Sequence, residues 1–174
     1  MNTEVKHSST FSPATLDLVK RIIARYPAGK QKSALLPVLH LAQAEFGGWL
    51  STETMDYVAS LLDIKPIEVY EVATFYTMFN LKPVGKCVLE VCRTGPCMLR
   101  GADEIIEHIE RKFNIRDGET SADGMFTLKT VECLASCGTA PVMQVGDHYI
   151  ENLSCESLDE ILDRLRAQQE QKAS

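Results

Sequence analysis

The cysteines of this 174-residue chain lie in its second half, and four of them form two spaced pairs. Cys92 and Cys97 enclose four residues, Cys133 and Cys137 enclose three, and 35 residues separate the pairs. Paired cysteines at such spacings are typical of a metal or cluster site. The second half is therefore constrained to a fold that brings two loops, far apart in sequence, to one place.

The charge is divided as unevenly as the cysteines. The formal net charge is −6, and residues 84–174 carry ten of the 18 Lys and Arg side chains but sixteen of the 24 Asp and Glu side chains. Without a basic surface, nucleic acid and anionic membranes are excluded as primary partners. An apolar content of 45% supports a packed core. We predict two unlike parts, residues 1–83 and residues 84–174.

Residues 1–83 show the spacing of apolar side chains that is typical of amphipathic helices. Ser12 followed by Pro13, Ser51 and Pro66 are typical helix starts. Four helices are expected, beginning at Pro13, at about Lys32, after Ser51 and at Pro66. The segment Glu71–Phe79 at the end of this part is apolar and aromatic, which suits an interface as well as an ordinary helix-end core.

Residues 84–174 alternate short β-branched runs with helical patterns. Strands are expected at 86–92, 125–131, 142–145 and 148–150, and helices at Leu99–Phe113 and after Ser157. The resulting order, β-α-β-β-β-α, is that of a small thioredoxin-like α/β sandwich. Pro141, just before a strand, is a candidate for a cis peptide bond.

Each cysteine pair directly follows a predicted strand, so both pairs are expected at one edge of the sheet. Cys92, Cys97, Cys133 and Cys137 then form a four-thiolate site. Structural zinc favours tight Cys-x₂-Cys turns, whereas a two-iron cluster accepts longer loops such as Cys-x₄-Cys. The spacing favours a [2Fe-2S] cluster, and a zinc-holding interaction module stays as the alternative.

Other chemistries find little support in the sequence. Cys87 is expected as a buried strand residue and Cys155 as a partly exposed loop residue, neither of them a ligand. No Cys-x-x-Cys occurs, so dithiol exchange is not expected. Gly85-Lys86 does not belong to a phosphate-binding loop, because Asn80 stands where that motif needs glycine. We predict no NADH, flavin or substrate site on this chain.

The sequence shows neither a secretory signal nor a membrane-spanning segment. Residues 1–13 are polar and lack a secretory signal, and no apolar run approaches the roughly 18 residues of a membrane-spanning helix. We expect a reducing compartment, where paired cysteines serve as metal ligands more often than as disulfides.

Several motifs together resemble a known family. They are Cys92-Arg-Thr-Gly-Pro-Cys97, Glu132-Cys-Leu-Ala-Ser-Cys137 with Ala140-Pro141 after it, Gly48-Trp49 and the segment Glu71–Phe79. From about Tyr26 to Arg166 the chain resembles the 24 kDa-type [2Fe-2S] subunit of respiratory complex I, the bacterial NADH-quinone oxidoreductase. Ala135 departs from that family, which commonly has glycine there.

The resemblance implies an α/β chain in which an N-terminal four-helix segment precedes a thioredoxin-like [2Fe-2S] ferredoxin domain. It implies that Cys92, Cys97, Cys133 and Cys137 hold one [2Fe-2S] cluster, and that the cluster exchanges single electrons with FMN on an NADH-binding partner during NADH:quinone oxidoreduction. It further implies that the helical segment of residues 1–83 docks onto this partner subunit, and that the protein is peripheral in the membrane complex, on the cytoplasmic side of the bacterial inner membrane. A similar subunit serves NAD-linked hydrogenases and formate dehydrogenases, which is the alternative within the same chemistry.

Overall fold

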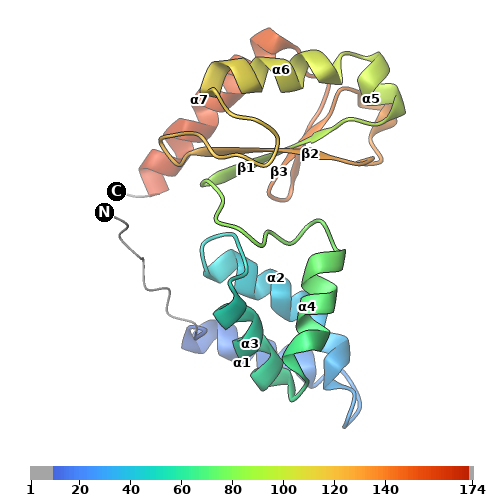
Figure 1. Ribbon diagram of the computed structural model, residues 1–174, viewed down its shortest axis with the longest axis vertical. Helices are drawn as coiled ribbons and strands as arrows, with labels where there is room; N and C mark the ends of the chain where they lie inside the picture. The colour runs from blue at the N-terminus through green and yellow to red at the C-terminus, as the bar shows by residue number, and fades with distance from the viewer. Residues whose placement is uncertain (1–9, 173–174) are drawn as a thin grey trace. The chain divides into compact units, whose positions relative to one another are not determined.

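The structure, a computed structural model, describes residues 10–172, and the chain divides into two units between Pro83 and Val84 (Figure 1). Each unit is described by itself. The expectation about a secretory signal in residues 1–13 falls mostly on residues 1–9, which lie outside the described residues.

The described residues of the first unit form four α-helices and one short 3-10 helix. These are α1 (Pro13–Ile23), η1 (Gln31–Ala34), α2 (Leu35–Glu45), α3 (Thr52–Leu62) and α4 (Pro66–Phe75). The predicted starts of three helices are confirmed. Ser12 caps α1, Ser51 caps α3 by accepting a hydrogen bond from the Thr54 N–H at 3.1 Å, and Pro66 is the first residue of α4.

The second helix begins later than predicted. The chain from Gln31 to Ala34 forms a 3-10 turn, and the α-helix starts at Leu35 instead of Lys32. Pro37 explains the delay, because proline fits the first turn of an α-helix, where its missing N–H leaves no hydrogen bond unmade.

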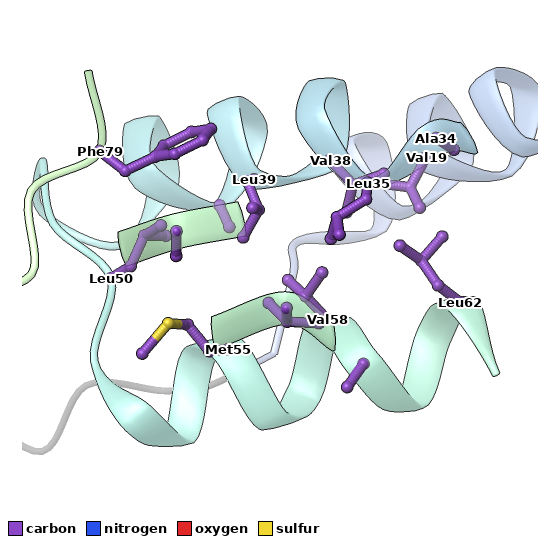
Figure 2. Packing of buried hydrophobic residues seen from close by; sticks show 14 of the residues in the cluster. Val19, Ala34, Leu35, Val38, Leu39, Leu50, Met55, Val58, Leu62 and Phe79 are labelled. Atoms are coloured by element: carbon purple, nitrogen blue, oxygen red, sulfur yellow. The ribbon is translucent and has the colours of Figure 1, made fainter. Parts of the chain in front are cut away.

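Apolar side chains of α2 and α3 face each other across the core of the first unit. Figure 2 shows Leu35, Val38 and Leu39 of α2 directed toward Val58 and Leu62 of α3. All five are buried. Burial of such side chains stabilises a small domain by roughly 1.5–3 kcal/mol each before the entropy of ordering is counted, so this interface holds the helical unit together.

The second unit is a four-stranded sheet with helices. Its elements are β1 (Cys87–Cys92), α5 (Gly95–Leu99), α6 (Ala102–Phe113), β2 (Phe126–Val131), η2 (Cys137–Thr139), β3 (Met143–Val145), β4 (His148–Ile150) and α7 (Cys155–Lys172). The strand order is β2-β1-β3-β4; β1 and β2 are parallel, and the other neighbours are antiparallel. The predicted α/β class and strand succession are confirmed.

One predicted helix of this unit is divided in two. In place of a single helix over Leu99–Phe113, α5 ends at Leu99 and α6 begins at Ala102. Gly101 between them has φ 94°, a left-handed conformation that glycine adopts without steric cost. The break turns the chain between the cysteine-bearing loop and α6.

The last helix begins two residues before its predicted cap at Ser157. The Ser157 N–H donates to the Ser154 hydroxyl at 3.2 Å, so Ser154 is the capping residue and Cys155 is the first residue of α7. Cys155 is partly buried and Cys87 is buried in the core of the second unit, as expected, but Cys155 lies in α7 and not in the predicted loop, because the helix begins earlier.

Helices α6 and α7 lie side by side on one face of the sheet (Figure 1). Asp159 of α7 accepts hydrogen bonds from Lys112 at 2.6 Å and from His108 at 2.9 Å, both on α6. Between the helices and the sheet lies a core that includes Leu89, Leu128, Met143, Ile109 and Leu158. Within residues 10–172, none of the helices has the length and apolar character that crossing a membrane requires.

Candidate metal centre

Both cysteine pairs lie at the same edge of the sheet. Cys92 is the last residue of β1 and pairs in register with Val131, the last residue of the parallel strand β2. Parallel strands end at one edge, so the loop after β1 and the loop after β2 leave the sheet together. The first loop carries Cys97 and the second carries Cys133 and Cys137, as the sequence predicts for a shared site.

The first pair is buried in a small apolar cluster. Cys92 and Cys97 are 2% and 3% exposed, and they pack with Ala102, Ala140 and Val142. Cys97 lies inside α5, and its N–H donates to the Thr94 carbonyl at 2.9 Å. The Ala140–Pro141 peptide bond is cis, as the position of Pro141 just before a strand suggests.

The second pair is exposed. The sulfur atoms of Cys133 and Cys137 are 3.9 Å apart, and Cys137 begins the short helix η2. The Ala135 N–H between them donates to the Cys133 sulfur at 3.3 Å. Ala135 has φ 60°, a left-handed conformation that costs an alanine energy and that glycine adopts freely. The glycine common in the resembling family at this position thus has a conformational reason.

The pKa values of the thiols show that the two loops influence each other. Burial opposes ionisation of Cys92, but hydrogen bonds from the Thr94 side chain and from the backbone of Thr94 and Leu134 outweigh it and lower its pKa. Burial and then the hydrogen bond to Cys92 raise the pKa of Cys97, with smaller contributions from the charges of Cys92 and Cys137. Leu134 of the second loop packs against the apolar cluster that contains Cys92 and Cys97, so the second loop contacts the first cysteine pair.

The donor set consists of two thiol pairs. The structure brings the cysteines together as pairs, and among residues 10–172 it gathers no three or more His, Cys, Asp or Glu side chains closely enough to hold a metal ion. A [2Fe-2S] cluster requires two thiolates for each of its two irons, which is what two pairs on adjoining loops can supply. The four residues therefore fit a [2Fe-2S] cluster. The two other cysteines lie apart in the fold, Cys87 in β1 and Cys155 at the start of α7.

A network of hydrogen bonds at the second loop was not predicted from the sequence. The hydroxyls of Ser136 and Thr139, which flank Cys137, both donate to the carboxylate of Glu151 after β4. These hydrogen bonds, from Ser136 first and then Thr139, hold the pKa of Glu151 below its ordinary value. Glu151 is one of many acidic residues in this half, and no local motif distinguishes it.

Comparison with known proteins identifies the family. The family model described as thioredoxin-like [2Fe-2S] ferredoxin matches residues 19–166. The chain belongs to this ferredoxin family. The match covers most of the helical unit as well as the sheet-containing unit of this ferredoxin, and it confirms the fold that the resemblance implies.

Curated relatives match this ferredoxin over most of its length. It is 47% identical to the E-subunit of NADH-quinone oxidoreductase from Rickettsia bellii, over 95% of this chain and 99% of the relative. It is 46% identical to the protein of the same name from Rickettsia conorii, again over 95% and 99% of the two chains. It is also 45% identical to the mitochondrial NADH dehydrogenase [ubiquinone] flavoprotein 2 of Dictyostelium discoideum, over 90% of this chain and 63% of that protein.

A solved structure shows the same fold. A chain of the NAD⁺-reducing [NiFe]-hydrogenase in its air-oxidized state matches with a TM-score of 0.67 and 19% identity, over 77% of this ferredoxin and 23% of the hydrogenase chain. At this identity the likeness concerns the fold alone. The matched share of this ferredoxin is larger than residues 84–174 alone, so the likeness includes part of the helical segment.

Proposed function

We propose that this ferredoxin is the electron-transfer subunit of an NADH dehydrogenase module, of the kind that the Rickettsia relatives from NADH-quinone oxidoreductase represent. The observation that carries the proposal is the placement of two cysteine pairs on contacting loops at one sheet edge, in a chain that matches such subunits over nearly its full length. In this role Cys92, Cys97, Cys133 and Cys137 are the ligands of one [2Fe-2S] cluster.

A bound cluster supplies one-electron chemistry, since its iron pair alternates between two oxidation levels. The chain's own residues supply its environment. Cys92 and Cys97 would hold a cluster from within an apolar environment, and Cys133 and Cys137 would hold it from the surface. Burial excludes water from the first pair of thiols, and exposure leaves the second pair open to the approach of a redox partner.

The partner in this proposal is a subunit that binds NADH and FMN, in the peripheral arm of a membrane complex on the cytoplasmic side of the bacterial inner membrane. FMN accepts the hydride of NADH as two electrons and can release them singly, so a one-electron carrier beside it is chemically matched. The helical unit of residues 1–83 is proposed as the docking element. Its exposed apolar side chains Phe75, Tyr76 and Met78 lie at the end of α4 and beyond it.

The ligand assignment is tested with the full chain purified without oxygen. We expect a brown protein with about two irons and an equal amount of acid-labile sulfide per chain, and an electron paramagnetic resonance (EPR) signal after dithionite reduction. Cys133→Ser is expected to lose or alter that signal. Cys155→Ser is the matched control, because Cys155 lies at the start of α7, and its spectrum should equal that of the wild type.

Two outcomes contradict the proposal. A colourless chain with one zinc per molecule would identify a zinc-holding interaction module, and a Cys133→Ser spectrum equal to the wild type would refute the ligand assignment.

Copurification from the native source tests the partner: an NADH- and FMN-binding subunit with quinone-reducing subunits is expected. A nickel or molybdenum subunit in their place would assign the same carrier to a hydrogenase or formate dehydrogenase.

A further inference from the structure

The residues on either side of Cys137 are tied to a segment that carries no cysteine ligand. Ser136 precedes Cys137, and Thr139 follows it by two positions in the short helix η2. The Thr139 hydroxyl donates to Oε1 of Glu151 at 2.6 Å, and the Ser136 hydroxyl donates to the same oxygen. The two hydroxyl oxygens are 2.8 Å apart. One carboxylate oxygen thus accepts hydrogen bonds from both ends of the turn that contains Cys137.

The backbone holds Glu151 beside that turn. The Asn152 N–H donates to the Thr139 carbonyl at 2.7 Å, and the Leu153 N–H donates to the Pro141 carbonyl at 3.2 Å. Residues 151–153 therefore run alongside residues 139–141. Asn152 adopts φ 52°, a left-handed conformation that asparagine tolerates better than most residues. The backbone of this segment, and not the carboxylate alone, determines where Glu151 lies.

The charge state of Glu151 suits an acceptor of two hydrogen bonds. Each hydroxyl has a single proton to donate, and the ionised carboxylate is the strongest acceptor within its reach; the Ser136 carbonyl, 3.2 Å from the Thr139 hydroxyl, is a weaker one. The carboxylate is ionised at neutral pH, as a Glu carboxyl with its ordinary pKa of 4.5 would be, and the two hydrogen bonds lower that pKa further. Cys137 is exposed, which leaves its loop dependent on polar contacts of this kind more than on burial.

We propose that Glu151 is a positioning residue of the cluster site: through Ser136 and Thr139 it fixes the turn that carries Cys137, and it places a negative charge beside the site. The inference rests on the proposed function for the presence of the cluster. In metal sites, residues that hold the ligands in place contribute strongly, and their removal weakens metal binding by about 10- to 100-fold. Glu151 is expected in that range.

Two substitutions separate the hydrogen bonds from the charge. Glu151→Gln keeps an oxygen that accepts from both hydroxyls but removes the charge, whereas Glu151→Ala removes both. Glu107→Ala is the matched control, because Glu107 is an exposed acidic residue on α6 of the same unit. All are made in the full chain and loaded with iron and sulfide without oxygen. The measurements are the rate of cluster loss to a chelator, the EPR spectrum and the midpoint potential.

We expect Glu151→Ala to lose its cluster about 10- to 100-fold faster than the wild type, and Glu151→Gln to restore a rate near that of the wild type. The midpoint potential of Glu151→Gln should shift in the positive direction, because removing a negative charge favours the reduced cluster. Glu107→Ala should match the wild type. Wild-type loss rate and potential in both Glu151 variants would overturn the proposal, as would equal acceleration in Glu107→Ala.

If the wild-type chain takes up no iron, the proposed function fails, and amide hydrogen exchange in the metal-free chain still decides the positioning role. The amides of Thr139 and Asn152 are then expected to exchange faster in Glu151→Ala than in the wild type and in Glu151→Gln. Equal exchange in all three chains would overturn the role of Glu151 independently of the cluster.

Discussion

Replacing Ala135 by glycine is expected to stabilise the second unit, although glycine normally destabilises a fold. Ala135 has φ 60° in the loop between Cys133 and Cys137. An L-residue in this left-handed conformation is strained by roughly 1–2 kcal/mol, which glycine does not incur. Glycine in turn gains about 0.4–1 kcal/mol of conformational freedom in the unfolded chain. Because Ala135 is exposed, little burial is lost, and the net gain in unfolding free energy is about 0.5–1 kcal/mol.

The assay is chemical unfolding of the full chain, followed by circular dichroism at equal cluster content. Ala167→Gly is the matched control, because Ala167 is also exposed but lies inside the helix α7. There glycine should lower the unfolding free energy by about 1 kcal/mol. The same substitution is therefore expected to act in opposite directions at the two positions.

Backbone strain at Ala135 is refuted if Ala135→Gly lowers the unfolding free energy as much as Ala167→Gly does. Ala135→Val gives a further check, since a β-branched side chain is poorly tolerated at positive φ and should destabilise the loop. The Ala135 N–H donates to the Cys133 sulfur, so the EPR spectrum of Ala135→Gly should remain that of the wild type if the loop keeps its shape.

Two other predictions concern the second unit. Gly85→Ala should lower the unfolding free energy by about 1–3 kcal/mol in a denaturant titration, because a β-carbon there would lie 2.9 Å from the backbone carbon and oxygen of Met125; an unchanged midpoint would contradict this. Hydrogen bonds from Ser121 and the Met125 N–H, followed by Arg166, lower the pKa of Asp123 to about 2 from an ordinary value of 3.8. Since the folded pKa is the lower one, this contribution is complete above about pH 4 and is lost as the pH falls toward 2. Asp123→Asn should flatten that part of the acid unfolding curve, and curves of equal slope for the two proteins would contradict the assignment.

The sequence predicts those features that depend on local pattern. Ser12 and Ser51 are found as helix caps because a capping hydroxyl and the apolar spacing after it are both local. The common sheet edge of the cysteine loops was also predictable. It follows from two strands of one parallel pair, each ending directly before its cysteines, and the register of Cys92 with Val131 bears this out.

The features that the sequence did not reveal depend on contacts between distant residues or on single backbone angles. The helix break at Gly101 is hidden because the apolar periodicity of Ala102–Phe113 continues back through Leu99. The contact between Glu151 and the Cys137 turn joins residues 12 and 15 positions apart through side-chain hydroxyls. No propensity or spacing rule signals such a bond, because it arises only after β3 and β4 have folded back.

Backbone strain is distributed in a way that singles out the cysteine loop. Within residues 10–172, four residues other than glycine have positive φ: Asp63, Asn114, Ala135 and Asn152. Three of them are Asp or Asn, whose short polar side chains make this conformation less costly, and Asp63 and Asn114 simply end helices.

Ala135 has no such polar side chain, and it lies between two proposed ligands. Strain of this kind persists only where surrounding contacts enforce it, and we predict that these include the hydrogen bonds that Ser136 and Thr139 make to Glu151. It follows that Glu151→Ala should relax Ala135 as well as the Cys137 turn, so the stabilisation from Ala135→Gly should be smaller in the Glu151→Ala background than in the wild type. Equal gains in the two backgrounds would show that the strain at Ala135 is enforced by other contacts.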